Sequence, residues 1–540
     1  MNLRHLQRAP FRLGAAELAW VEQTFTRLNP RERLAQLLVP LAVDTSADNL
    51  ERFASLGVGG LFRSATRPPA QLREEAQRLR AASAVPPLLC ADLEFGELGA
   101  IGGIEGTAYP NPLAASAAGL DAVARMATVA ADEGRAGGFN WSLTPVADLD
   151  FDRNNPVVST RAFGDDPRHV ARCVGRYIET LQRRGMAACA KHWPGDGAGD
   201  LDQHNTTAIN PLPPATWART YGRVFRAAIR AGVLSLMSGH IALPGRKGAG
   251  RTPATLSRQL NLRLLRAELG FNGVILSDAS SMAGLTTQAP REKLVSQVIA
   301  NGCDLLLFPV DPELDLDYLA RAVAAKRLPD ERVAEAVLRV LALKANLGLP
   351  RQNRAPRPLS RTARDRHRRW AEETAQAAVT LVRDDAALLP LNPRYHHRLL
   401  LIEPQRRAGW AGALPPLQIE TALRAAGFNV MRYSEPADIT RERFDAAIWV
   451  TADEAGTGKH SLRVPWSELL GPFPLSMART WPELPTVFIS LGHPWQVREL
   501  SGCPVVINAY SPVPAVQQAV VRALLGHARF RGVSPVRLRA

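Results

Sequence analysis

The residues best placed to do chemistry lie in one polar loop that runs from Lys191 to His204. The loop follows the apolar run 186–190, which has the length and composition of a buried strand. Glycines then leave the chain free to turn, and Asp202 lies close enough in sequence to pair with His204. This loop is either a polar surface connection or a mobile lid that brings an aspartate-paired histidine to a substrate held by Lys191 and His192.

A second candidate is the carboxylate of Asp278, which follows the apolar run 273–277. An aspartate at the end of a strand can cap the helix or turn that comes next. It can also act as a nucleophile toward the anomeric carbon of a sugar, because the buried strand holds it in place. The next residue is Ala279, which counts against a substrate-assisted hexosaminidase mechanism, since that mechanism needs two carboxylates.

Two further residues are candidates for holding a sugar. Asp92 ends the strand candidate 87–92 and is a natural acceptor for sugar hydroxyls, with capping as its alternative role. Arg161 lies in a long polar loop, where most arginines are solvated surface residues. If Arg161 lies beside Lys191 and His192, its guanidinium would donate a fixed fork of hydrogen bonds to the sugar.

Short apolar runs alternate with helical patterns from residue 37 to about residue 310. The eight strand candidates are 37–43, 57–62, 87–92, 138–143, 186–190, 233–237, 273–277 and 304–308. This alternation is typical of a (β/α)8 barrel, although a doubly wound sheet explains it equally well. The barrel is favoured because polar candidates directly follow strands, and in a barrel those strand ends converge on one mouth. The residues concerned are Asp92, Lys191, His192, His240 and Asp278.

The alternation breaks at residues 351–369, which are basic, contain two prolines and show little apolar periodicity. This stretch is predicted to be a linker that follows a barrel domain of residues 1–350. A helix from Trp370 then leads into a second pattern over residues 370–540, where we expect a smaller layered α/β sandwich domain. Its strand candidates are 399–402, 447–450, 486–491 and 505–509.

The composition of the chain limits which cellular compartment and which classes of binding partner are expected. The chain has 540 residues, 46% of them apolar, and a net charge of +15, which fits a globular protein of two or three domains. Its basic residues form no compact stripe with interleaved aromatic residues, so no specific nucleic-acid partner is expected. The five cysteines lack metal-ligand spacing and fit buried thiols in a reducing compartment. No apolar stretch has the length of a signal peptide or a membrane span, so we expect a soluble, cytoplasmic protein without membrane contact. The oligomeric state is not predicted.

Several ordered motifs resemble glycoside hydrolase family 3 and, within that family, the bacterial β-N-acetylglucosaminidases. The matching segments of the barrel are Gly57-Val-Gly-Gly60, Lys191-His-Trp-Pro-Gly195, Asp202-Gln-His204, Pro253-Ala-Thr-Leu-Ser257, the run from Glu268 to Asp278, and Arg161-Ala-Phe-Gly164. In the second domain they are Ser490-Leu-Gly-His-Pro494 and Asn508-Ala-Tyr510. The resemblance covers most of the chain.

The resemblance implies a barrel followed by a second α/β domain, with Asp278 as the nucleophile. It also implies that Asp202 and His204 form the acid/base dyad of the N-acetylglucosaminidase branch. Four residues match positions that bind the sugar, namely Asp92, Arg161, Lys191 and His192. No metal or organic cofactor is implied. The β-glucosidases of the family take their acid, a glutamate, from the second domain, and the sequence does not identify an equivalent here.

The motifs depart from the family pattern at three places. The family loop usually reads Pro-Gly-His-Gly-Asp, and here Asp196 replaces the histidine and Ala198 the aspartate. Ala279 replaces a second carboxylate after the nucleophile, and Asp92-Leu-Glu-Phe-Gly96 replaces an aspartate-x-glutamate-glycine-glycine segment. These changes leave every expected catalytic group in place but affect loop geometry and substrate preference.

The expected activity is that of a retaining exo-β-N-acetylglucosaminidase acting on soluble glycans such as cell-wall fragments. One alternative shares this chemistry but passes the sugar to phosphate. Another belongs to a different class of protein, a catalytically weak barrel that binds a sugar or an anionic polymer.

Overall fold

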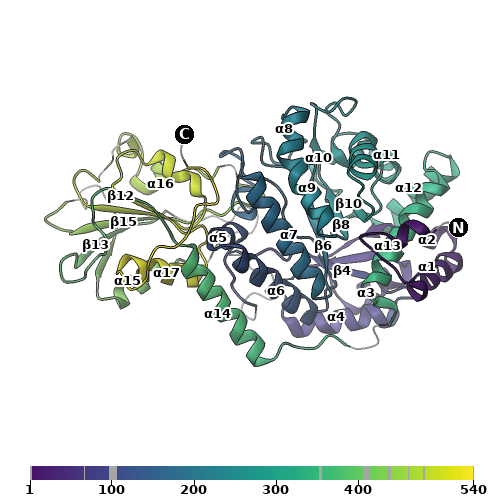
Figure 1. Cartoon of the computed structure of the whole chain (residues 1–540), viewed down its shortest axis with the longest axis horizontal. Helices are drawn as coiled ribbons and strands as arrows, with labels where there is room; N and C mark the ends of the chain where they lie inside the picture. Colours follow the sequence, from purple (N-terminus) through teal and green to yellow (C-terminus); the bar gives the residue numbers. More distant parts are fainter. Residues whose placement is uncertain are drawn as a thin grey trace.

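The structure is a computed structural model of the chain. It describes all residues except 1–2, 66, 97–105, 352–354, 405–413, 415, 435–439, 460, 478, 480 and 539–540. Two sheet-containing parts lie side by side, and the long helix α14 (Arg361–Ala378) runs along both of them (Figure 1).

The first part is a closed parallel barrel. Its larger sheet has the order β10-β8-β6-β5-β4-β3-β2, and β1 pairs in parallel with β11. A bridge between Leu276 and Leu305 joins β10 to the segment of β11. β1 and β2 are consecutive pieces of one segment, separated at Pro40, which has no N–H to donate to a neighbouring strand. The wall therefore closes, and the expected (β/α)8 barrel is confirmed.

Each of the predicted barrel strands overlaps an observed one. They are β1 (Leu38–Val39), β2 (Leu41–Ala42), β3 (Gly60–Arg63), β4 (Leu88–Ala91), β5 (Trp141–Ser142), β6 (Ala187–Trp193), β8 (Ser235–Ser238), β10 (Val274–Ser277) and β11 (Leu306–Leu307). A two-stranded ladder of β7 (Ala208–Ile209) and β9 (Ile241–Ala242) joins the loops that follow β6 and β8.

Helices surround this barrel wall (Figure 1). They are α1 (Ala15–Arg27), α2 (Pro30–Ala35), α3 (Ala47–Leu56), α4 (Pro69–Ala82), α5 (Pro112–Ala118), α6 (Leu120–Ala136), α7 (Pro167–Arg183), α8 (Pro214–Arg219), α9 (Tyr221–Arg230), α10 (Ala283–Thr286), α11 (Arg291–Ala300), α12 (Pro312–Ala324) and α13 (Asp330–Asn346). Further helical segments are η1 (Arg4–Gln7), η2 (Ser159–Arg161), η3 (Ala254–Leu256), η4 (Gln259–Glu268) and η5 (Leu349–Arg351).

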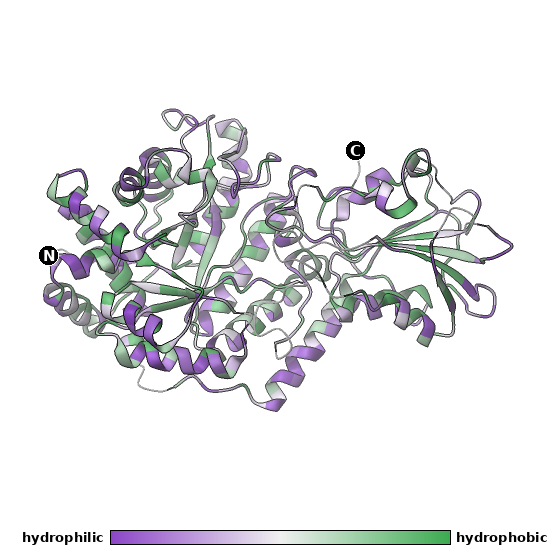
Figure 2. Ribbon diagram, turned by 180° about the vertical axis from the view of Figure 1, so that it is seen from behind, coloured by the Kyte–Doolittle hydropathy of each residue, from purple (hydrophilic) through white to green (hydrophobic). Residues whose placement is uncertain are grey.

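Helix α7 illustrates how the sequence positions strand β6, which carries Lys191 and His192. Asp166 caps the helix, because its carboxylate accepts hydrogen bonds from the backbone N–H groups of Arg168 and His169, both at 2.8 Å. Its buried residues recur at helical spacing, from Val170 to Leu181, while β6 is buried along its whole length. Figure 2 shows the same division, with apolar strands inside and polar residues on the outer faces of the helices.

The second part is a six-stranded sheet of order β12-β17-β16-β15-β13-β14, in which β12 alone runs antiparallel to its neighbour. The strands are β12 (Thr380–Asp384), β13 (Arg398–Ile402), β14 (Asn429–Arg432), β15 (Ala446–Thr451), β16 (Thr486–Ser490) and β17 (Val505–Asn508). The helices are α15 (Ile419–Ala425), α16 (Trp466–Leu470), α17 (Pro514–Leu524), η8 (Leu475–Met477) and η9 (Pro494–Glu499). Apolar cores on both faces confirm the expected layered α/β domain. The sequence missed β12 and β14, the two edge strands.

Helix α14 corrects the predicted linker. It begins at Arg361, inside the stretch 351–369, and not near Trp370 as expected. The hydroxyl of Ser360 caps it by accepting a hydrogen bond from the N–H of Ala363 at 3.2 Å. The first turns are rich in arginine and carry little apolar periodicity, so the polar run resembled a linker. The domain limits 1–350 and 370–540 remain predictions.

Within the described residues, no helix combines the length and the apolar character needed to cross a membrane. All five cysteines are buried and free.

Candidate active site

The polar candidates gather at one end of the barrel because its strands are parallel and end at the same rim. Asp92 follows β4, Lys191 and His192 lie in β6, and Asp278 follows β10. The loops from the same rim carry Arg161, Asp202 and His204.

Asp278 combines burial with a negative charge. Its backbone N–H donates to the carbonyl of Ser238 at 2.8 Å, and its Oδ1 accepts from the N–H of Ala279, also at 2.8 Å. Oδ2 has no hydrogen-bond partner among the described residues. Burial alone would raise the pKa of Asp278, but positive charge on the histidines around it, His192 first, holds that pKa below its usual value. The site thus contains an ionised carboxylate with one oxygen available for reaction.

Asp202 and His204 form the pair that the sequence predicted. Nδ1 of His204 lies 2.6 Å from Oδ1 of Asp202, and the backbone N–H of His204 donates to the same oxygen at 2.9 Å. Burial would raise the pKa of Asp202, but its hydrogen bonds from His204 lower it overall, so the carboxylate is ionised. A carboxylate at Nδ1 fixes the proton on that nitrogen and leaves Nε2 to give or take the second proton.

A segment of the second part, residues 452–459, lies against this pair. The N–H of Gly456 donates to the carbonyl of Pro156 at 2.9 Å, and Oγ1 of Thr457 lies 3.4 Å from Nε2 of His204. The Asp202–His204 pair is therefore bordered by both parts of the chain. The sequence offered no signal for this contact, because nothing in it relates residue 457 to residue 204.

Glu454, in the same segment, is a glutamate of the second part that contacts residues of the first part. Its Oε1 accepts hydrogen bonds from Nδ2 of Asn111 at 2.6 Å and from Oγ of Ser511 at 3.0 Å. Its carboxylate also lies so close to Gly96 that a Cβ there would come within 2.8 Å of Oε2. These contacts make Glu454 an anchor for the segment.

Lys191 and Arg161 both bind the carboxylate of Glu94, a residue for which the sequence predicted no role. Nζ of Lys191 lies 2.6 Å from Oδ1 of Asp92 and 2.7 Å from Oε1 of Glu94. Arg161 donates two hydrogen bonds to Glu94, at 2.8 and 2.9 Å, so its fork is directed first at a carboxylate. Burial opposes the charge on Lys191, but Asp92 and Glu94 raise its pKa overall. The position of Glu94, two residues after Asp92, was the available signal.

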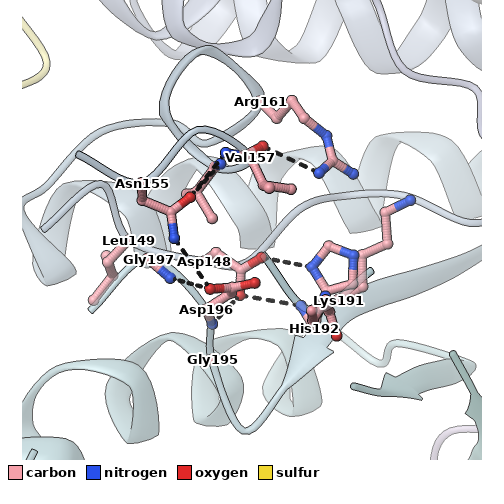
Figure 3. A network of polar contacts seen from close by, with 12 residues as sticks. Asp148, Leu149, Asn155, Val157, Arg161, Lys191, His192, Gly195, Asp196 and Gly197 are labelled. Atoms are coloured by element: carbon pink, nitrogen blue, oxygen red, sulfur yellow. Dashed lines mark hydrogen bonds and ion pairs between the residues drawn. The ribbon is translucent and has the colours of Figure 1, made fainter. Parts of the chain in front are cut away.

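His192 is held by another carboxylate without a predicted role, Asp148 (Figure 3). Oδ2 of Asp148 lies 2.7 Å from Nδ1 of His192, and Oδ1 accepts from the backbone N–H of His192 at 3.1 Å. Burial would lower the pKa of His192, but Asp148 raises it overall. Asp148 closes the segment after the strand candidate 138–143, which was the signal in the sequence.

His240 supports the chain beside Asp278. Its Nδ1 lies 2.9 Å from Oγ1 of Thr255, and its Nε2 lies 2.9 Å from the carbonyl oxygen of Ala279, to which it donates. Burial lowers the pKa of His240. This histidine, which follows β8, thus positions the residue after Asp278.

Comparison with known proteins places the chain in a family. Residues 30–343 match the model of the glycosyl hydrolase family 3 N-terminal domain. A β-N-acetylglucosaminidase/β-glucosidase from Cellulomonas fimi is 34% identical over 558 residues, covering 98% of this chain and 98% of that protein. A β-hexosaminidase from Xanthomonas oryzae pv. oryzae is 34% identical over 289 residues, covering 52% of this chain and 84% of that protein.

Solved structures agree with this placement. A β-glucoside phosphorylase is 30% identical, with a TM-score of 0.91 over 100% of this chain and 99% of that one. A family 3 β-N-acetylglucosaminidase from Paenibacillus shares the fold, with a TM-score of 0.82, 24% identity, and coverage of 95% of this chain and 99% of that one. The chain therefore belongs to glycosyl hydrolase family 3, where its relatives include the β-hexosaminidases, and it is a glycoside hydrolase.

Proposed function

We propose that the enzyme is a retaining exo-β-N-acetylglucosaminidase that releases terminal β-linked N-acetylglucosamine from soluble glycans, such as cell-wall fragments, in the cytoplasm. The observation that supports this proposal is that one barrel mouth holds both Asp278, an ionised carboxylate with one oxygen that no described residue hydrogen-bonds, and a histidine paired with its own aspartate. A retaining mechanism requires a nucleophile and an acid/base group of this kind.

In the first half-reaction, Oδ2 of Asp278 attacks the anomeric carbon and the glycosidic C–O bond breaks. The proton on Nε2 of His204 moves to the departing oxygen, and the ionised Asp202 stabilises the positive imidazolium before that transfer. The sugar is then bound covalently to Asp278.

In the second half-reaction, Nε2 of His204 takes a proton from the incoming water. The water oxygen attacks the anomeric carbon, the bond to Asp278 breaks, and the carboxylate is restored. Two inversions at the anomeric carbon leave its configuration unchanged.

The remaining site residues hold the sugar in this proposal. The side chain of Asp92 is 47% exposed and accepts hydrogen bonds from sugar hydroxyls. The ammonium group of Lys191, whose side chain is 3% exposed, holds Asp92 in place through an ion pair. His192 donates from Nε2, since its Nδ1 is held by Asp148. Arg161 orients Glu94 and shares that carboxylate with Lys191. The relatives named β-hexosaminidase support N-acetylglucosamine as the sugar.

A second candidate function is a phosphorylase, in which phosphate replaces water. It is favoured by the similarity to a β-glucoside phosphorylase and by the chemistry of the acid/base group. An anionic base would repel phosphate, by roughly 1 kcal/mol at ~4 Å in bulk water and by about 4 kcal/mol at an effective dielectric constant of 20. His204 is neutral after giving up its proton, although Asp202 beside it retains some negative charge. This site is therefore permissive to phosphate, and we still favour water on the motifs.

Product analysis separates these functions. The enzyme is given nitrophenyl N-acetylglucosaminide, and in parallel nitrophenyl glucoside, with and without millimolar phosphate, and the released sugar is identified. We expect N-acetylglucosamine in both conditions. A sugar 1-phosphate as the main product would overturn the hydrolase proposal in favour of the phosphorylase, and turnover of the glucoside alone would overturn the assignment of the sugar.

A further inference from the structure

Asp196 occupies the position where the family loop usually has a histidine, and it lies inside the polar network of the site (Figure 3). We propose that Asp196 works as a neutral carboxylic acid that positions His192 and the base of the loop 195–204, and that loss of its proton displaces both. In this role Asp196 does not touch the substrate. It is a positioning residue for the reaction.

The backbone of Asp196 is tied to the group that holds His192. Its N–H donates to Oδ1 of Asp148 at 2.7 Å, the oxygen that also accepts from the N–H of His192. Its carbonyl oxygen accepts from the hydroxyl of Tyr221 at 2.7 Å. A movement of Asp196 would therefore shift the carboxylate of Asp148 and, through it, His192.

The two oxygens of the Asp196 side chain have different surroundings. Oδ1 accepts from the N–H of Gly197 at 2.6 Å and from Nδ2 of Asn155 at 3.4 Å. Oδ2 is buried without a hydrogen-bond partner in the part of the chain that the structure describes, and the residue is 4% exposed. A full negative charge in this position would be buried and incompletely solvated, which strongly disfavours ionisation.

Charged and titratable groups face Asp196 from four elements. Asp148 follows β5, His192 lies in β6, Arg161 ends η2, and Tyr221 begins α9. Burial raises the pKa of Asp196 to about 7, with a further contribution from the negative charge of Asp148, against the opposing positive charges of His192 and Arg161. The geometry and the charges thus both favour the neutral form below neutral pH.

Ionisation of Asp196 would place two like charges side by side in a buried site. Asp148 would then be repelled from the position in which it holds His192. The disturbance also reaches the loop, because Asn155 donates both to Asp196 and, at 2.7 Å, to the carbonyl of Gly199. That loop carries Asp202 and His204. We therefore expect a loss of activity as the pH rises through about 7.

Stability should follow the same titration. The pKa of Asp196 is raised from the ordinary value of 3.8 to about 7 in the folded chain. The stability that the neutral form contributes is therefore complete below about pH 4 and lost as the pH rises through about 7.

The test compares the wild type with Asp196→Asn, which keeps the shape of the side chain and stays neutral at every pH. The ratio of variant kcat to wild-type kcat should rise by about tenfold between about pH 6 and about pH 8.5, as the wild type alone ionises. The matched control is Asp150→Asn. Asp150 is buried, its Oδ2 accepts from Nε1 of Trp495 at 2.9 Å, and burial raises its pKa to about 7 as well. For Asp150→Asn the kcat ratio should not change with pH.

Infrared difference spectroscopy between the two pH values reports directly whether the carboxyl group of Asp196 carries a proton. In the Asp150→Asn background, a protonated-carboxyl C=O band should disappear as the pH rises, and it should be missing in the double variant Asp150→Asn/Asp196→Asn. The absence of that band, or a kcat ratio for Asp196→Asn that stays flat with pH, would overturn the proposal. The kcat measurement rests on the function proposed above, whereas the infrared band needs no substrate. Failure of the two can thus be told apart. If Asp196→Asn does not fold, the absence of the band in Asp150→Asn, which keeps Asp196, still overturns the proposal.

Discussion

The site contains two aspartate–histidine pairs that have the same atoms and nearly the same length but different settings. Asp148 and His192 meet at 2.7 Å across the barrel wall, with side chains 0% and 6% exposed. Asp202 and His204 meet at 2.6 Å within one loop, with side chains 8% and 20% exposed. The first pair is fixed by neighbouring strands, whereas the second has access to solvent. Burial and anchoring, and not pairing itself, therefore distinguish the two histidines, and they fit the proposed roles in which His192 holds the sugar and His204 exchanges a proton.

The largest expected effect comes from Asp278, which both pairs serve. Asp278→Asn should reduce kcat by at least about a thousandfold, because the covalent intermediate is lost. The fold should survive, since the change removes a buried charge without changing the shape of the side chain. Steady-state kinetics and a thermal unfolding curve measure the two effects. A variant with near-native kcat would remove Asp278 from the mechanism.

Breaking the solvent-accessible pair should affect chemistry more than stability. His204→Ala should lower kcat by about 10²–10⁴-fold on a substrate with a poor leaving group, because general acid catalysis is lost. Bond cleavage in a nitrophenyl glycoside should suffer much less, because a nitrophenolate hardly needs a proton when it leaves. Pre-steady-state release of nitrophenolate gives this comparison. Equal losses on both substrates would mean that His204 is not the acid.

Breaking the buried pair should affect stability first. His192→Ala leaves Asp148 buried and without its charged partner, so the free energy of unfolding should fall by about 3 kcal/mol. The double variant His192→Ala/Asp148→Ala should recover part of this loss, since no unpaired charge remains. Chemical denaturation measures both. If the double variant is less stable than the sum of the two single changes implies, Asp148 does not act mainly as the partner of His192.

The smallest effect is expected from Asp202. Asp202→Ala should lower kcat by about tenfold, less than loss of the acid itself, because the carboxylate no longer orients His204 or stabilises its imidazolium. The pKa of Asp202 lies below its usual value in the folded chain. Its contribution to folding stability is therefore present above about pH 4 and is lost as the pH falls through the folded pKa. Rate profiles on a substrate with a poor leaving group test this. An unchanged rate would exclude this role of Asp202.

Much of the fold could be predicted because buried parallel strands read as continuous apolar runs. The runs at 186–190 and 273–277 both became strands, β6 and β10, with polar residues at their ends. Edge strands escaped this criterion, since β14 has one buried residue and no apolar run. Helix α14 escaped because its first turns are basic and its buried residues, His367, Ala371, Thr374, Ala375 and Ala378, include no large apolar side chain.

The candidate site was predictable where a residue's role follows from its place at a strand end, and not where it depends on a distant partner. Asp278 and the Asp202–His204 pair could be named from local sequence. Glu94 and Asp148 could not be assigned roles, because the role of each depends on a basic side chain that another strand or loop brings to it. Thr457 contacts His204 from the second part of the chain, and neither hydrophobic periodicity nor a sequence motif predicts such a contact.

The most direct measurement of the central claim, that Asp278 is the nucleophile, is covalent trapping. A 5-fluoro analogue of an activated N-acetylglucosaminide slows breakdown of the glycosyl-enzyme, and peptide mass spectrometry then locates the sugar. The account expects one added sugar on the peptide containing Asp278 and none in Asp278→Asn. A label on Asp92, Asp202 or another residue, or steady turnover of the analogue by Asp278→Asn, would contradict it.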